Sequence, residues 1–143
     1  MINICIPGHP RALKRHRTTR TGHIYDPSYK DKKIINILIS TKKPMRPIKG
    51  DVGIDYIFTF KRPKTHYRTG KYKDQLKDKA PYFHISVPDI DNLIKLYNDV
   101  LQDGFIKNDS QICKIKAKKV YGKIPSVEIN IRGAINERNN RIS

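Results

Sequence analysis

Apolar side chains recur at every second position of one central segment, namely Val52, Ile54, Tyr56, Phe58 and Phe60. A period of two places these side chains on one face of a β-strand. The spacing therefore predicts a strand over 52–60 that buries one face, which requires a sheet around it and a covering layer above it. Weaker alternation predicts further strands over 2–6, 82–87, 111–120 and 126–132.

Two segments have the helical period instead. Over 92–103, an apolar stripe recurs at helical spacing; we expect Asp91 at the N-cap and Gly104 at the C-terminal stop. A shorter helix is predicted over 28–40. The order of elements is typical of a single α+β domain with a mixed β-sheet and two main helices. We expect this domain to span 1–132, with a long basic loop at 61–81 and a polar, frayed tail at 133–143.

The charge of the chain predicts its partners. Its 143 residues contain 30 lysines and arginines against 13 acids, a formal net charge of +17. A cation of this density binds polyanions, most often nucleic acid. No apolar run reaches the roughly 20 residues of a membrane-spanning helix, so we expect no membrane partner. We also expect no small-molecule cofactor.

Local features of the sequence predict the cellular compartment and the state of the two cysteines. The first six residues are uncharged and strand-like rather than a signal peptide, which favours the cytoplasm. Cys5 and Cys113 form no metal-binding pair. We expect both to be buried free thiols.

Acidic residues are scarce, and two of them stand close together. Asp89 and Asp91 flank one residue where a strand is expected to meet a helix, which places both carboxylates on one side. Two carboxylates in a cationic protein favour a hard divalent ion such as Mg²⁺. Lys95 follows one helical turn later, and Asp109 lies in a polar turn beyond the helix. Each acid also has a structural interpretation, as a cap, a solvated face or a turn residue.

The pattern around these residues resembles a known family. The run Asp89-Ile90-Asp91-Asn92-Leu93-Ile94-Lys95, followed by Asp99-Val100-Leu101, Gly104-Phe105 and Asn108-Asp109-Ser110-Gln111-Ile112, is similar to the signature block of the RusA family of Holliday junction resolvases. Looser similarity covers Pro10, Lys14, Arg15, Arg17, Gly22, Tyr25 and Pro27. Residues 61–81 show no resemblance.

The resemblance implies a RusA-like fold and a homodimeric crossover junction endodeoxyribonuclease that uses Mg²⁺, with Mn²⁺ as an alternative ion. It implies that Asp89, Asp91 and Asp109 bind the metal and that Lys95 is the essential lysine. Asp99 also matches a family position, but we expect no direct catalytic role for it. Asn108 differs from those members that carry an aspartate there.

The basic residues form three clusters: the opening segment, the 61–79 segment and the lysines of 114–119. Solubility or an AT-rich genome also explains the strand lysines, whereas the arginines of the opening segment predict a DNA-binding surface. The candidates in the opening segment are Arg11, Lys14, Arg15, Arg17 and Arg20. Arginine holds phosphate through two hydrogen bonds, which suits recognition of branch shape rather than sequence. Lys114, Lys116 and Lys118 are expected on the opposite strand face from Cys113, Ile115 and Ala117.

Three functions fit the sequence. The favoured one binds branched DNA, specifically four-way junctions, and resolves them by paired symmetric cleavage. The alternatives are a non-catalytic nucleic-acid-binding protein and a metal nuclease for flaps or single strands. A twelve-residue helix spans about 18 Å, and residues 105–109 extend at most about 17 Å. Asp109 therefore only just reaches the Asp89–Asp91 pair within one subunit, and a dimer interface is the other route.

Overall fold

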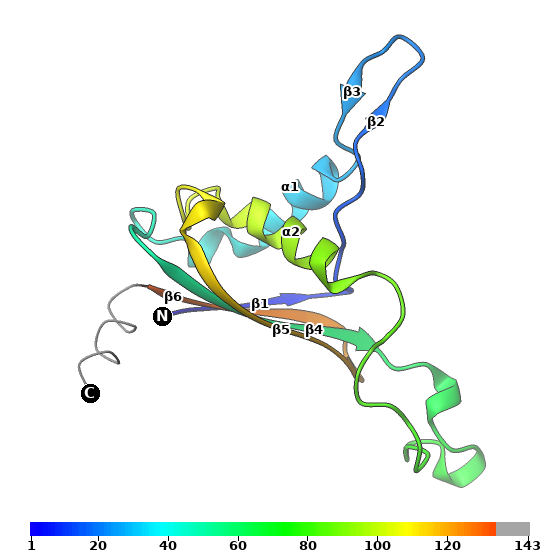
Figure 1. Cartoon of the computed structure of the whole chain (residues 1–143). Coiled ribbons are helices and arrows are strands. Elements are labelled where there is room, and N and C mark those ends of the chain that lie inside the picture. Colours follow the sequence, from blue (N-terminus) through cyan, green and yellow to red (C-terminus); the bar gives the residue numbers. More distant parts are fainter. Residues whose placement is uncertain (134–143) are drawn as a thin grey trace.

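A computed structural model describes residues 1–133 of the chain. A single four-stranded sheet forms the base, and the helices lie over one of its faces (Figure 1). The strands of this sheet are β1 (Ile2–Pro7), β4 (Val52–Lys61), β5 (Ile112–Gly122) and β6 (Ser126–Gly133). The helices are α1 (Tyr29–Ile39) and α2 (Ile90–Leu101), with short 3₁₀ turns η1 (Ser40–Lys42), η2 (Lys64–His66), η3 (Gly70–Tyr72) and η4 (Asp109–Gln111). This arrangement confirms the α+β prediction.

The sheet is mixed, as predicted. Its strand order is β1-β6-β4-β5. β6 runs antiparallel to both of its neighbours, whereas β4 and β5 are parallel. A parallel pair needs a long crossover connection, and here that connection carries both the 61–81 segment and α2. The topology therefore places α2 in the crossover that joins β4 to β5.

The predicted alternation forms the core. Ile54, Tyr56 and Phe58 of β4 are at most 1% exposed, and Val127, Ile129 and Ile131 of β6 are equally buried. α2 packs its apolar stripe onto them, through Leu93, Leu96, Tyr97, Val100 and Leu101. Full burial of one such side chain contributes about 1.5–3 kcal/mol, so this layer holds α2 firmly against the sheet.

α2 begins two residues earlier than predicted. Asp89, in extended backbone, is the N-cap residue, and Asp91 lies in the first turn, so the prediction of Asp91 as the cap is wrong. The first helical bond, from the Leu93 amide to the Asp89 carbonyl at 3.2 Å, fixes this start. The helix ends at Leu101, and Gly104 with φ +98° turns the chain so that the next two amides donate to the Leu101 carbonyl. Gly104 thus supplies the predicted stop.

The opening basic segment contains a hairpin that the sequence does not predict. β2 (Arg17–Thr18) and β3 (Ile24–Tyr25) pair antiparallel, and the hairpin projects away from the sheet (Figure 1). Strands of two residues are too short to produce an alternation pattern. The base is fixed by Ser28, which is fully buried and whose hydroxyl accepts a hydrogen bond from the Lys14 amide at 2.8 Å. We call residues 14–27 the hairpin arm.

The strand predicted over 82–87 is wrong. Only Phe83 forms a bridge, to Val120 of β5. Ile85 and Val87 are 91% and 81% exposed, so their alternation does not bury a face. The 61–81 segment is exposed, as predicted, but it is folded into η2 and η3. We call residues 61–81 the basic lobe.

The predictions for the β5 lysines are confirmed, whereas those for the cysteines are wrong. Lys114 and Lys116 pair with Gly53 and Asp55 on the face without helices, and Ile115 and Ala117 lie on the helix-covered face, as predicted. Cys5 and Cys113 are exposed, which contradicts the buried thiols. Cys5 lies on the uncovered face of β1, and a register shift displaces β5 at Cys113.

None of the helices within residues 1–133 is long and apolar enough to cross a membrane. The predicted frayed tail lies outside the described residues, apart from Gly133, which ends β6.

Candidate active site

The Asp89–Asp91 pair lies at the N-terminus of α2, and both residues are exposed. Asp89 makes no side-chain capping hydrogen bond, so its carboxylate oxygens are not used in starting the helix. The positive end of the helix dipole stabilises negative charge in this first turn. The helix therefore holds two carboxylates in place while leaving them free to bind a ligand.

The pair opens into a groove of about 590 Å³. The groove runs between the start of α2, the 83–87 segment and β5. Its lining consists of Phe83, His84, Ile85, Ser86, Val87, Asp89, Ile90, Asp91, Ala117, Lys118 and Lys119. Two aspartates and two lysines are thus among the residues that line one hollow, a combination that suits a divalent ion beside a phosphodiester.

Lys119 fixes the segment that carries the pair. Its ammonium donates hydrogen bonds to the carbonyls of Ser86 and Pro88, each at 2.6 Å. Pro88 directly precedes Asp89, so these bonds set the backbone position from which the pair begins. Sequence reasoning places Lys119 among the general basic residues. Its role depends on β5 pairing beside the 83–88 segment, which no local pattern reveals.

His84 joins the groove to the basic lobe. Its ring stacks on Phe60 with centroids 3.9 Å apart and meets Tyr121 edge-on, while its amide donates to the Lys119 carbonyl at 3.0 Å. Burial and the nearby Lys119 ammonium lower the pKa of His84. The imidazole is therefore neutral at neutral pH and acts as part of the aromatic support under the groove.

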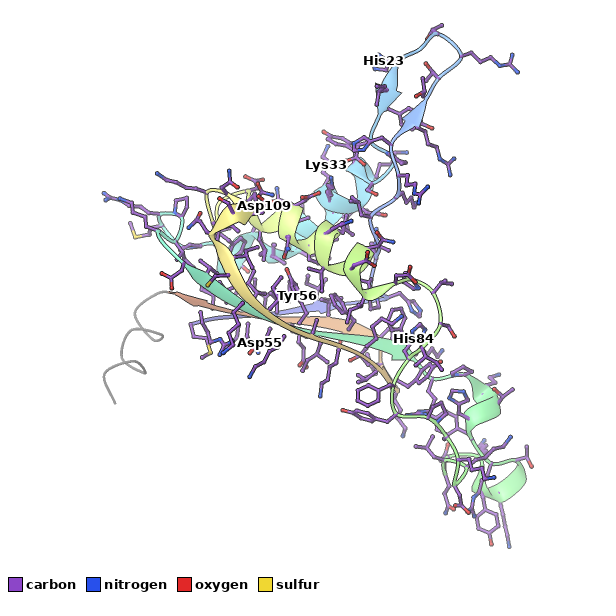
Figure 2. All side chains as sticks on the ribbon, in the orientation of Figure 1. His23, Lys33, Asp55, Tyr56, His84 and Asp109 are labelled. Carbon is purple, nitrogen blue, oxygen red and sulfur yellow. The ribbon has the colours of Figure 1, made fainter. Side chains whose placement is uncertain are left out.

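Asp109 lies apart from the other two aspartates. It sits in η4, beyond the far end of α2, and Figure 2 shows it at the opposite end of the sheet from His84 of the groove. Within residues 1–133, no three acidic, histidine or cysteine side chains converge to hold a metal ion. A single subunit therefore brings Asp89 and Asp91 together but not Asp109.

Gln111 fixes the geometry of this turn through its side-chain hydrogen bonds. Its side-chain oxygen accepts from the amides of Lys107 and Asn108, and its amide group donates to the carbonyls of Ile48 and Gly50, both at 2.8 Å. The Asn108 side chain caps the same turn by accepting from the Ser110 amide at 2.9 Å. Asn108 and Gln111 thus shape the turn and present Asp109 to solvent.

The remaining polar residues of α2 have different surroundings. Lys95 is exposed one turn beyond Asp91. Asp99 instead pairs with Lys32 at 3.2 Å, and Lys32 also donates to Asp26 at 2.8 Å. The bond from Lys32 lowers the pKa of Asp26, and despite burial the two carboxylates raise the pKa of Lys32. Asp99 therefore ties α2 to the base of the hairpin arm.

The five predicted DNA-binding residues separate into two groups. The Arg11 guanidinium pairs with Asp31 at 2.6 Å, and its amide donates to the Tyr97 hydroxyl at 3.0 Å, so Arg11 anchors the segment to both helices. Lys14, Arg15, Arg17 and Arg20 are exposed on the hairpin arm. Only these four present their charge to a ligand.

The fold and the groove define a class: a basic α+β domain that presents a carboxylate pair among cations, as enzymes that act on phosphodiesters do. The comparisons are more specific. The family model for endodeoxyribonuclease RusA matches residues 7–132, and the chain belongs to this family. Membership supports nuclease activity that depends on a metal ion, with branched DNA as the substrate.

The chain is also similar to a bacterial protein of nearly the same length. It is 31% identical over 136 residues to the uncharacterized protein YqaN of Bacillus subtilis (strain 168), an alignment that covers 92% of this chain and 95% of that protein.

Proposed function

We propose that this chain is a Mg²⁺-dependent endonuclease that binds four-way DNA junctions and resolves them by paired, symmetric phosphodiester cleavage. One observation carries the proposal. The Asp89–Asp91 pair opens, without capping bonds from Asp89, into a groove that Lys118 and Lys119 also line, in a chain with a net charge of +17. A pure DNA-binding protein has no need of paired carboxylates, because without a metal they repel phosphate.

The residues of the groove have distinct roles in this proposal. Asp89 and Asp91 hold the ion, since hard cations select carboxylate oxygens and Mg²⁺ takes few of them; Mn²⁺ fits the same donors. When bound, a divalent ion held by these carboxylates would polarise the phosphate and lower the pKa of an attacking water. Lys95, one helical turn from Asp91, stabilises negative charge that develops on the phosphate. Lys119 keeps the carboxylate segment in position.

We propose that Asp109 completes the metal site from a second copy of the chain. Asp89 and Asp91 lie at the N-terminal end of α2, and Asp109 lies beyond its C-terminal end, so most of the helix, about 18 Å long, separates them. A two-fold axis that passes beside the middle of α2 places the N-terminal end of one helix next to the C-terminal end of its partner. In such a dimer, each Asp109 approaches the partner's carboxylate pair, and both sites are completed at once.

An apolar strip between α2 and β5 supports this arrangement. We define the apolar strip as Ile85, Val87, Ile90, Ile115 and Ala117. Ile115 pairs with Ile54, which is fully buried, yet Ile115 is 39% exposed because α2 does not cover the edge strand. Exposed apolar patches of this kind mark interaction surfaces. All strip residues except Ile115 also line the groove, and β5 runs directly from η4 to Ile115 and Ala117, so the strip extends from the groove toward Asp109.

The test is a comparison of substrates. A four-way junction, a flap and a linear duplex of shared sequence are incubated with the protein in Mg²⁺, in Mn²⁺ and in EDTA, and the cut positions are mapped on each strand. We expect two symmetric nicks in the junction, an intact duplex and no cleavage in EDTA. Preferential cleavage of the flap would assign the chain to simpler substrates. Junction binding without cleavage in either metal would make it a binding protein.

A further inference from the structure

We infer that the basic lobe is a second DNA-contacting element, which holds the phosphate backbone of a duplex arm on the opposite side of the groove from the hairpin arm. This inference rests on the proposed function, because it assigns the lobe to the same substrate. The family signature residues quoted above lie outside the lobe, so its role is argued from its own contacts, charge and position.

The lobe is a folded unit with its own hydrogen bonds. Tyr67 and Leu76 form a bridge, the Arg68 amide donates to the Gln75 carbonyl at 2.8 Å, and the Lys77 amide donates to the His66 carbonyl at 2.9 Å. Neither η2 nor η3 contains a buried residue. A segment that is folded but has almost no apolar core presents its side chains to solvent in fixed positions.

The lobe is fastened to the end of the sheet beside the groove. Arg62 donates to the Pro81 carbonyl at 2.6 Å, which closes the two ends of the lobe, and lies over the Tyr121 ring at 5.3 Å. His66 packs edge-on against the same ring. Tyr121 also contacts His84 of the groove, so lobe and groove share one aromatic support.

The charge of the lobe exceeds what its fold uses. Its 21 residues include eight lysines and arginines and two aspartates. The ion pair described within it joins Arg68 to Asp78 at 3.2 Å, and the Asp78 side chain is 91% exposed. Exposed pairs of this kind contribute little to stability. Fold stability therefore does not account for the charge, whereas binding to a polyanion does.

The lobe also has a hollow of about 400 Å³ on its surface. Its lining is Lys64, Tyr67, Arg68, Thr69, Gly70, Lys73 and Asp74. Three cationic side chains outnumber the one acid, and hydroxyl groups accompany them, a lining that matches a sugar-phosphate backbone. The half-buried Tyr67 gives the hollow a firm wall, because its backbone is held by the bridge to Leu76.

The position of the basic lobe favours DNA as its ligand. In Figure 1, the hairpin arm and the basic lobe project in opposite directions, and the start of α2 with its carboxylate pair lies between them. DNA that places a phosphate on the pair extends toward both projections. An acidic protein would match the charge of the lobe equally well, but it gives no reason for a second basic projection across the groove.

The experiment removes two charges from the hollow. Lys64→Gln/Lys73→Gln is compared with Lys42→Gln/Lys49→Gln, an equal charge change at exposed positions away from the lobe, and with Lys64→Arg/Lys73→Arg, which keeps the charge. Affinity for a four-way junction is measured in EDTA over a series of salt concentrations. Each lost phosphate contact lowers the salt slope by about 0.9, so the lobe variant is expected to lose about 1.8. When the salt concentration rises fourfold, the loss of affinity is then expected to be about tenfold smaller for the lobe variant than for wild type.

A second measurement separates a bound duplex arm from general attraction. Wild type is expected to bind a junction with long arms more tightly than one whose arms are cut to roughly one helical turn, and the lobe variant is expected to lose that preference. Equal slopes for the lobe and control variants, or arm-length dependence that survives in the lobe variant, would overturn the inference. So would an effect on an acidic protein or RNA with none on DNA.

Cleavage in Mg²⁺ is scored separately. The Lys42→Gln/Lys49→Gln control is expected to cut at the wild-type rate, because its substitutions lie outside both the groove and the lobe. If wild type cuts no DNA, the proposed function fails, while the binding result still decides whether the lobe contacts DNA.

Discussion

Helix capping does not account for Asp89 and Asp91. The Asp89 side chain makes no capping bond although it stands at the N-cap position, and Asp91 lies inside the first turn. Replacing either aspartate by asparagine keeps its shape and removes the charge. We expect cleavage to fall about a thousandfold or more, because a bound metal contributes several kcal/mol and each ~1.4 kcal/mol is a factor of ten. Cleavage assays and junction binding in EDTA measure the two properties.

Junction binding in EDTA is expected to stay intact in both variants, and circular dichroism reports whether they fold. Wild-type cleavage by a folded variant would remove that carboxylate from the mechanism.

Lys119 is expected to act through the segment that it holds. Lys119→Met removes both hydrogen bonds to the Ser86 and Pro88 carbonyls. Hydrogen bonds from a charged donor contribute about 1.5–3 kcal/mol, so the carboxylate pair loses its fixed position. We expect half-maximal cleavage to need about tenfold more Mg²⁺, since ~1.4 kcal/mol of lost metal affinity corresponds to that factor. Titration of Mg²⁺ at saturating junction concentration tests this.

Lys119→Arg keeps a charged donor and is expected to restore part of the metal affinity. A purely structural role would lower thermal stability in Lys119→Met and leave the Mg²⁺ requirement unchanged, a result that would contradict the positioning role.

At the scale of elements, the hairpin arm is expected to contribute affinity without sequence preference. Arg15 and Arg17 are exposed on it, and Arg11 is occupied by Asp31. Arg15→Gln/Arg17→Gln is expected to weaken binding to all DNA sequences alike and to lower the salt slope by about 1.8. Salt titrations on junctions of two unrelated sequences provide the measurement. Weaker binding to only one sequence would instead identify these arginines as base readers.

Arg11→Gln is the matched comparison for the arm. It removes an anchor rather than a displayed charge, so it is expected to lower thermal stability and to change the salt slope less than removal of either exposed arginine does.

The elements that the sequence predicts are those with a local period. The strands at 52–60 and 126–132 and the helix stripe from Leu93 to Leu101 repeat their apolar residues often enough to fix the period. The hairpin arm is missed because its strands have two residues each. The 82–87 segment shows the opposite failure: its alternation is real, but Ile85 and Val87 remain exposed and only Phe83 pairs with β5.

The site was predictable in part. Residues 89–112 resemble the family signature, and this resemblance, rather than spacing alone, is the basis for predicting Asp89, Asp91, Lys95 and Asp109 as one set. The contribution of Lys119 could not be predicted, because it depends on β5 lying beside the 86–88 segment. The position of Asp109 depends on how far α2 separates it from the pair, which becomes clear only in the folded chain.

At the scale of the whole molecule, the proposed homodimer would account for both the apolar strip and the distant Asp109. Light scattering at micromolar concentration is expected to give about twice the mass of 16.6 kDa. Val87→Lys, at a position that is 81% exposed in the single chain, is expected to produce monomers with little cleavage activity. Ile124→Lys, at 76% exposure in the turn between β5 and β6, is the matched control and is expected to remain dimeric.

Mixed dimers distinguish a site completed by the partner from one built within a single chain. One protein carries Asp89→Asn and Asp91→Asn, the other carries Asp109→Asn, and each is expected to be inactive alone. If Asp109 acts across the interface, one site of the mixed dimer contains all three asparagine substitutions. The other site contains three native aspartates. Mixing the two proteins then restores cleavage, but as a nick in one strand of the junction rather than as paired cuts. If all three aspartates act within one chain, both sites of the mixed dimer are defective and no activity returns. Subunit exchange is verified with a size tag on one protein, so that absence of cleavage in confirmed mixed dimers overturns completion by the partner.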